Sequence, residues 1–138
     1  MSKNDGFPRS VTTALVPVAL ALLVTGCAAD LTVTSVGTAS FIGSMRQLKV
    51  AVANRGVRPA PASQTSVGMG AGPAGPFSTS LWPTPALAPG AEHVIAPIPF
   101  PETPQTCYVK ACADPTNVTG EGWASRQNNC LEQSFCRP

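Results

Sequence analysis

The residues of this chain best suited to chemistry are its cysteines. Four of them lie near the C-terminus with separations of 5, 18 and 6 residues: Cys107, Cys112, Cys130 and Cys136. An even number of cysteines in an exported chain indicates disulfides. Zinc is the alternative, but these separations match no common ligand pattern, and the only histidine, His93, lies far from them in the sequence. We therefore expect two disulfides and no bound metal.

The fifth cysteine, Cys27, stands in a different setting. It follows a short basic start and an apolar run over residues 11–24, which is typical of a signal peptide. At 14 residues the run is too short to serve as a transmembrane helix, which needs about 20. The segment Val24-Thr25-Gly26-Cys27 resembles the bacterial lipobox. The resemblance implies cleavage before Cys27, a diacylglycerol on its sulfur and an acylated amino group; the alternative is an ordinary signal peptide cut at Ala28 or Ala29.

Lipidation of Cys27 would make this residue a membrane anchor, because two or three acyl chains hold a small domain on a bilayer almost permanently. We expect a lipoprotein signal peptide over residues 1–26, the lipidated cysteine and a short tether over 27–29, and one domain over 30–138. Alanine rather than aspartate follows the cysteine. By resemblance to enterobacterial sorting, this favours the outer membrane, on its periplasmic or surface face. The expected location is the bacterial cell envelope.

The composition of the remaining domain disfavours nucleic-acid binding and helical structure. Removing residues 1–26 leaves seven basic and six acidic side chains, without a basic run that would contact phosphates. The chain contains 15 proline and 12 glycine residues, which is typical of β structure with many loops. The glycine-rich segment 70–76 lacks the lysine and hydroxyl residue of a phosphate-binding loop, so we expect an ordinary turn there.

Alternating apolar and polar residues predict an all-β domain. Residues 46–54 alternate clearly and predict a strand with one buried face. In residues 92–98 we expect Val94, Ala96 and Ile98 to share a face. The prolines at and after residue 97 cannot donate to a ladder, so this segment lies at a sheet edge or leaves the sheet early. The remaining strands are predicted at residues 30–36, 63–69, 77–82, 106–114 and 130–135.

The disulfide pairing can be tested by strand register. Directly opposed residues of an antiparallel pair have residue numbers with a constant sum. Cys112 with Cys130 gives 242, and Cys107 with Cys136 gives 243, so both bonds fit one hairpin with a single-residue bulge. This nested pairing is the one we select from three possible connectivities. On the last strand, alternation predicts that Leu131, Gln133 and Phe135 point inward.

Four segments, taken in order, resemble the CARDB domain, a cell-adhesion-related domain of bacteria. They are Asp30-Leu31-Thr32-Val33-Thr34-Ser35-Val36, Val50-Ala51-Val52-Ala53-Asn54-Arg55-Gly56, Leu87-Ala88-Pro89-Gly90, and Ala111-Cys112-Ala113-Asp114-Pro115 with Asn128-Asn129-Cys130. The resemblance covers nearly all of residues 30–136 and implies an immunoglobulin-like antiparallel β-sandwich of about seven strands.

The chain departs from this family next to its paired asparagines, where Arg126 stands in place of an expected acid. A calcium site built from Asp114, Glu121 and Asn128 is therefore not expected. We expect instead that Asp114 and Asn117 shape the turn and that Asn128 caps the last strand.

The sequence favours a binding module over an enzyme. One histidine, no free thiol after disulfide formation and no paired carboxylates leave no nucleophile with a base, so we expect no catalytic residue and no cofactor. Trp82 and Trp123 are candidate contacts for a protein or glycan partner; alternatively, each covers the domain's own core. Membrane contact is expected through the lipid on Cys27. The alternative function is a structural accessory subunit of an envelope protein complex.

Overall fold

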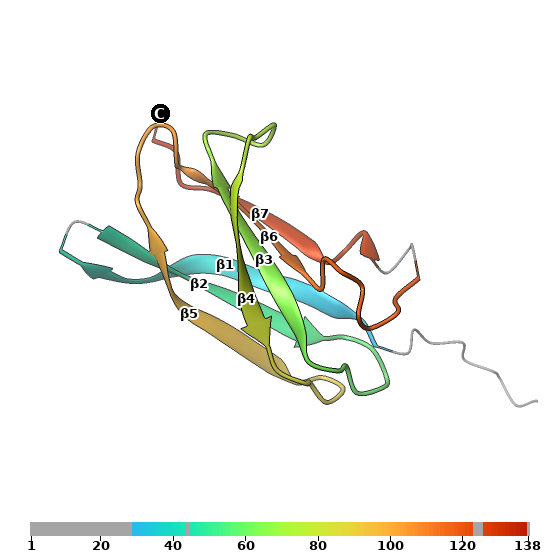
Figure 1. Cartoon of the computed structure of the whole chain (residues 1–138). Coiled ribbons are helices and arrows are strands. Elements are labelled where there is room, and N and C mark those ends of the chain that lie inside the picture. Colours follow the sequence, from blue (N-terminus) through green and yellow to red (C-terminus); the bar gives the residue numbers. More distant parts are fainter. Residues whose placement is uncertain (1–28, 44, 123–125, 138) are drawn as a thin grey trace, which may run out of the picture.

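The computed structural model describes residues 29–43, 45–122 and 126–137. Within these residues two antiparallel sheets face each other (Figure 1). Their strands are β1 (Leu31–Ile42), β2 (Met45–Asn54), β3 (Ser63–Gly70), β4 (Ser78–Thr84), β5 (Glu92–Phe100), β6 (Tyr108–Ala113) and β7 (Cys130–Ser134). No helix in this part of the chain has the length and hydropathy needed to cross a membrane. The predicted signal peptide over residues 1–26 lies outside the described residues.

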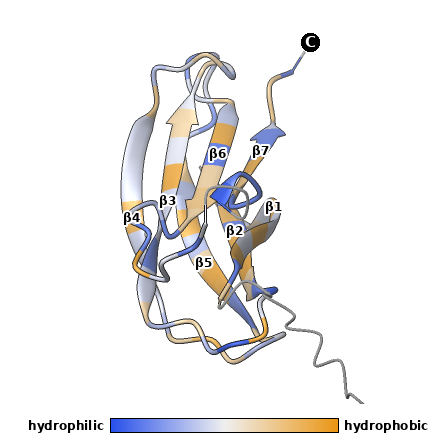
Figure 2. Ribbon diagram, turned by 90° about the vertical axis from the view of Figure 1, so that its right-hand side faces the viewer, coloured by the Kyte–Doolittle hydropathy of each residue, from blue (hydrophilic) through white to orange (hydrophobic). Residues whose placement is uncertain are grey.

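The strand order confirms the predicted immunoglobulin-like sandwich. One sheet has the order β1-β2-β5 and the other β4-β3-β6-β7. In constant-type immunoglobulin domains the fourth strand lies beside the fifth; here β4 pairs with β3 instead. In Figure 2, β3 and β6 carry hydrophobic bands, whereas most of β4 is pale. The pale colour agrees with β4 being an edge strand whose residues 78–81 are exposed.

The core fills the space between the sheets. The largest fully buried apolar side chains come from four strands of both sheets and from the end of β5: Leu31, Leu48, Val50, Val52, Val67, Ile98, Phe100 and Val109. The prediction that β2 has only one buried face was wrong, because Ala51 and Ala53 on the other face are also buried. β2 lies between β1 and β5, and a methyl side chain is short enough to be covered by the neighbouring strands.

β5 occupies the predicted edge position, but its inward residues differ from the expected ones. Val94 is 48% exposed, while Ile95 and Ile98 are buried. Val50 of β2 pairs with Ile95 and Leu48 pairs with Ile98, so two residues of β5 oppose one residue of β2 between these pairs. This bulge reverses the alternation, which a strict period of two does not anticipate.

Two disulfides join Cys112 to Cys130 and Cys107 to Cys136, which is the nested pairing predicted from register. The β6–β7 ladder keeps one register from Cys112↔Cys130 to the end of β7, so the predicted bulge is absent from it. The one-residue difference between the two disulfides arises after β7 ends, because Phe135 pairs with Cys107 and the next residue, Cys136, forms the disulfide. Leu131 and Gln133 are exposed rather than buried, because β7 is an edge strand that the opposite sheet does not fully cover. Phe135 packs against the core as predicted.

The strand directions give the sandwich two distinct ends. The loops over residues 55–62 and 85–91 and the described residues 114–122 and 126–129 lie at the end where β1 starts, and we call this the tether end. The turn between β1 and β2, the loops over 71–77 and 101–107 and the C-terminal residues 135–137 form the distal end. β1 has 12 residues and joins the two ends, a span of about 40 Å at about 3.3 Å per residue.

The first described residue, Ala29, is packed into the tether end. It is only 3% exposed and belongs to the core. Gly56 lies against it so closely that an added Cβ would be 2.7 Å from the Ala29 Cα. A residue larger than glycine at position 56 would therefore displace the backbone of residues 29–30. The position of Ala29 is therefore fixed by its packing against the domain.

Candidate functional site

A hollow of about 560 Å³ opens at the distal end. Phe41 at the end of β1, residues 102–104 of the loop before β6 and residues 135–137 of the C-terminal segment form most of its wall. These segments are far apart in the sequence and come from both sheets. The hollow therefore exists only after the two sheets have packed together.

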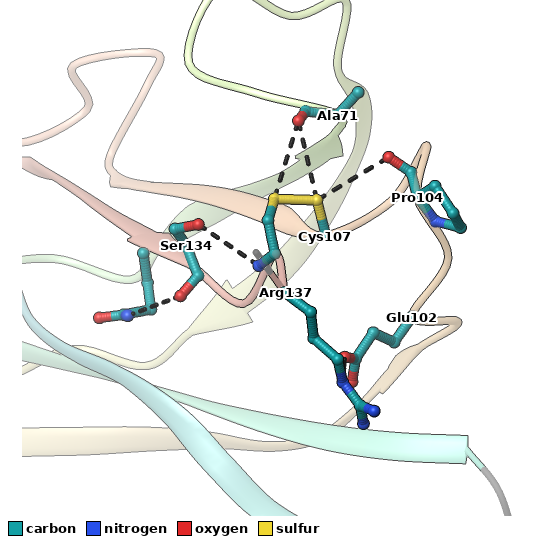
Figure 3. Close-up of a disulfide and its surroundings, with 8 residues drawn as sticks. Ala71, Glu102, Pro104, Cys107, Ser134 and Arg137 are labelled. Atoms are coloured by element: carbon teal, nitrogen blue, oxygen red, sulfur yellow. Dashed lines mark hydrogen bonds and ion pairs between the residues drawn. A yellow bond between two sulfur atoms is a disulfide. The ribbon is translucent and has the colours of Figure 1, made fainter.

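A disulfide holds the C-terminal segment against this hollow. The amide of Phe135 donates to the carbonyl of Cys107 at 2.7 Å, and the next residue, Cys136, is bonded to Cys107 (Figure 3). The two sulfurs lie 3.7 and 3.8 Å from the carbonyl oxygen of Ala71. An oxidised sulfur carries no hydrogen, so this is a packing contact. The bond thus fixes the C-terminal segment beside the loops that follow β3 and precede β6.

Two arginines and one glutamate set the charge around the hollow. Arg46 Nη2 lies 2.8 Å from Glu102 Oε2, with about four fifths of each side chain buried. The Arg46 guanidinium also lies over the rings of Phe41 and Phe135, 5.6 and 5.0 Å from their centroids, which adds cation–π attraction. The other Glu102 oxygen lies 3.6 Å from Nε of the exposed Arg137. The cluster carries one surplus positive charge, and Arg46 Nε is buried without a hydrogen-bond partner among the described residues.

Beside the hollow, the β1–β2 hairpin extends beyond the rest of the sandwich (Figure 1). Its end exposes apolar side chains. Phe41 is 61% exposed, Ile42 65% and Met45 44%. We call these three residues the hairpin tip. The sequence prediction missed it, because the first strand was ended at Val36 and residues 37–40 do not alternate. The apolar pair Phe41-Ile42 directly before Gly43, separated from the alternating core residues, could have predicted an exposed apolar turn.

The structure brings one pair of the sequence-predicted site residues to this hollow, the disulfide-bonded Cys107 and Cys136. Trp82 does not line it. This side chain on β4 is half-buried and packs against the core, and its Nε1 donates to Ser80 Oγ at 2.9 Å. Its placement favours the core-covering role over a stacking platform. Cys27 and Trp123 lie outside the described residues.

The residues considered for calcium are engaged in hydrogen bonds at the tether end. Both oxygens of the buried Asp114 accept hydrogen bonds: Oδ1 from Val118 N, and Oδ2 from the amide and hydroxyl of Thr119. Glu121 Oε1 accepts from the amide of Leu31 at 2.6 Å, and Oε2 from Asn129 Nδ2 at 2.7 Å. These contacts close the loop before β7 onto the start of β1.

Two asparagines next to these acids behave differently. Asn117 has a positive φ of 57° and accepts from the amide of Glu121, so it shapes the turn as expected. Asn128 was expected to cap the last strand, but its side chain is exposed and its Nδ2 lies 3.5 Å from Asp30 Oδ2. The neighbouring Asn129 is buried instead, and its side-chain amide donates to Glu121.

A smaller polar cluster lies on the outer face of the β6–β7 hairpin. The Tyr108 hydroxyl donates to Glu132 Oε2, and Lys110 Nζ lies 3.1 Å from Glu132 Oε1. The hydrogen bond from Tyr108 and then that from Lys110 lower the pKa of Glu132 below its ordinary value. The same hydrogen bond raises the pKa of Tyr108. The stabilising effect of Glu132 is present above its unfolded-state pKa and is lost as the pH falls through the lowered folded-state pKa.

Tyr108→Phe is therefore expected to shift the pKa of Glu132 upward, toward its ordinary value. Phenylalanine keeps the ring but removes the donor that stabilises the carboxylate most. The titration of the Glu132 side-chain carboxyl by NMR measures this shift, and the other carboxyl signals of the same spectra serve as internal controls. Equal midpoints for Glu132 in the two proteins would contradict the assignment.

Within the described residues, no group of three or more His, Cys, Asp and Glu side chains is arranged to hold a metal ion. The hollow is lined by Glu102 and Arg137 together with the rings of Phe41 and Phe135, and Arg46 pairs with Glu102 next to it. This composition is suited to binding an apolar surface that carries an acidic group. Comparison with known proteins gave one family match: the CARDB model matches residues 28–133. No curated protein and no solved structure gave a significant match.

Proposed function

The chain belongs to the CARDB family, and from this premise we propose that it is a lipid-anchored binding module of the bacterial cell envelope that holds a protein partner at its distal end. The family indicates an adhesion-related, non-enzymatic domain. The lipid on Cys27 supplies the membrane attachment, and the lipobox sequence favours the outer membrane.

The observation that carries this proposal is the exposed hairpin tip beside the hollow. Aromatic residues and methionine are enriched in the buried centres of protein interfaces. Phe41, Ile42 and Met45 would bury a substantial apolar area on contact with a partner. Phe41 is an exposed ring next to charged groups, which a sugar could also use, but Ile42 and Met45 are exposed aliphatic side chains without hydrogen-bonding groups. The tip therefore supports a protein partner over a sugar.

The charges around the hollow specify the partner further. The surplus positive charge of Arg46, Glu102 and Arg137 favours an acidic side chain next to the partner's apolar contact. The Arg137 guanidinium is exposed on most of its surface and can bind such a carboxylate at the rim.

A second candidate is the structural accessory subunit of an envelope protein complex. The burial of Ala29 favours it, because only Ala28 then separates the lipidated cysteine from the packed domain. The distal end would stand about 40 Å from the tether end, which limits the reach of the module. A partner in the same envelope lies within that reach, whereas a surface outside the cell generally does not.

Photo-crosslinking in cells tests both versions of the proposal. A benzophenone amino acid at position 42 is expected to give one discrete adduct with one protein. Met45→Asp, made in the same probe protein, is expected to reduce the capture of that protein at least tenfold, because Met45 is the other exposed side chain of the hairpin tip next to the probe. A hot-spot residue at the centre of an interface contributes about 2 kcal/mol or more, and tenfold corresponds to about 1.4 kcal/mol. The identity of the adduct, an envelope protein of the same cell or a protein outside it, separates the two candidates.

The matched control is the same probe at position 94. Val94 is also exposed and apolar but lies on β5, paired with Ala51 and away from the distal end. Equal adducts from positions 42 and 94, or no adduct from position 42, would reject the distal end as the binding site. Loss of the adduct in Cys27→Ala is expected if the anchor places the domain beside its partner.

A further inference from the structure

Two loops of the tether end enclose the residue from which the lipid tether leaves. The amide of Arg55 donates to the carbonyl of Asp30 at 2.7 Å, which fixes the loop over 55–62 against the start of β1. On the other side, Glu121 accepts from the amide of Leu31, which fixes the loop over 114–129. Both loops therefore have a fixed position relative to Ala29.

The distance from these loops to the lipid is short. From Cys27 to the buried Ala29 the chain extends at most about 7 Å, at about 3.5 Å per residue. If Cys27 carries the lipid, as the proposed function requires, both loops lie next to the headgroup layer. No flexible linker separates them from it, because Ala29 is already part of the core.

The exposed side chains of the two loops suit an anionic bilayer surface. In their described parts the exposed charged residues are all arginines: Arg55, Arg58 and Arg126. No ion pair joins these arginines to an acid among the described residues. The two acids of the loops, Asp114 and Glu121, are buried and accept hydrogen bonds from the protein. Asp30 lies between the loops, half-buried and within 3.5 Å of the side chains of Thr32 and Asn128.

The same loops also expose two branched apolar side chains. Val57 is 67% exposed and stands between Arg55 and Arg58, and Val118 on the other loop is 55% exposed. Apolar groups flanked by arginines match the boundary between headgroups and acyl chains, where each buried CH₂ and each nearby basic residue favours binding.

We propose that the tether end is a phospholipid-binding surface, in which Arg55, Arg58 and Arg126 bind headgroup phosphates of anionic lipids and Val57 and Val118 enter the acyl boundary. This proposal depends on the proposed lipid anchor. The surface would add to the anchor a fixed orientation of the domain relative to the membrane. It holds the domain upright on the membrane with β1 pointing away from it, so that the hairpin tip faces the partner.

The test uses the mature lipoprotein, purified from membranes and reconstituted in vesicles of phosphatidylcholine and phosphatidylglycerol with brominated acyl chains. Tryptophan is introduced by Val57→Trp or, as the matched control, by Ile42→Trp at the distal end. The emission of the unsubstituted protein accounts for Trp82 and Trp123. Bromine quenches only indoles that reach the acyl region, so we expect at least twofold quenching of the added fluorescence for Val57→Trp and none for Ile42→Trp.

The triple substitution Arg55→Gln, Arg58→Gln, Arg126→Gln, made in the Val57→Trp protein, tests the electrostatic part. It is expected to abolish most of the quenching of the added fluorescence, since each basic residue near an anionic bilayer changes the partition roughly fivefold. Equal quenching in Val57→Trp and Ile42→Trp, with the protein still floating with the vesicles, would overturn the phospholipid surface and leave the anchor standing. Failure of the unsubstituted protein to float would overturn the anchor, and the surface with it.

Discussion

Replacing Asn54 with alanine is expected to lower the free energy of unfolding by about 4 kcal/mol, a large part of the roughly 5–15 kcal/mol typical of a domain. The Asn54 side chain is fully buried and uses its complete hydrogen-bonding capacity. Its Oδ1 accepts from the amides of Asp30 and Gly56, and its Nδ2 donates to the carbonyls of Arg58 and Leu87, all within 3.2 Å. Alanine leaves the amides of Asp30 and Gly56 and the carbonyl of Arg58 without this partner, at about 1–3 kcal/mol for each one that stays buried. The Leu87 carbonyl keeps its hydrogen bond from the amide of Ala60.

Urea denaturation followed by circular dichroism measures this effect. Asn54→Asp is a useful second variant, because it keeps the shape and the acceptor but loses both donors and buries a charge; we expect it to be at least as destabilising. Asn128→Ala is the matched control, since that side chain is exposed and its one contact is 3.5 Å long. It is expected to change stability by less than about 0.5 kcal/mol. A loss below about 1 kcal/mol in Asn54→Ala would show that water replaces the amide without cost.

The second large effect is expected from the disulfide between Cys112 and Cys130. Replacing both cysteines with serine opens a loop of 18-residue separation, which costs about 3 kcal/mol in the loop-entropy model. All five residues of β7 are exposed, so this strand has little buried surface of its own to hold it against β6. We therefore expect the amides of β7 to lose protection in hydrogen exchange before those of the other strands.

The other disulfide provides the comparison. Serine at positions 107 and 136 releases residues 135–137, which form one wall of the hollow, but leaves the Cys112–Cys130 bond in the ladder. We expect that variant to keep protection in β7 and to lose the crosslink from position 42. Equal loss of β7 amide protection and of the crosslink in both double variants would contradict the separate roles assigned to the two disulfides.

The features that could be predicted from the sequence are those whose causes lie within one strand or one pair of residues. A cross-strand disulfide needs directly opposed residues, so the residue numbers of Cys112 and Cys130 were enough to predict the register of β6 and β7. The bulge in β5 was not predictable in this way, because its position depends on how Leu48 and Val50 of another strand pair with it. The burial of Ala51 and Ala53 likewise depends on the neighbours of β2 on both sides.

The features of the two ends were harder to predict for the same reason. Asn54 was predicted as the last residue of the strand over 46–54, whereas its burial requires segments from three parts of the chain to meet around its amide. The hollow needs Phe41, Glu102 and Phe135, which come from opposite ends of the domain's sequence. The alternation of apolar and polar residues within one strand does not predict contacts between segments that are far apart in the sequence.

Because β1 runs without interruption from Leu31 to Ile42, the strand that begins at the tether is also the strand that ends at the hairpin tip. If Cys27 carries the proposed lipid and a partner binds the tip, a mechanical pull on the tip would pass to the anchor through the peptide bonds of this one strand. Little tension would fall on the hydrogen bonds between the other strands or on the β6–β7 hairpin. The domain would therefore resist tension along β1 with the strength of a covalent chain, and the two bulges in the pairing of β1 with β2 would not interrupt that path.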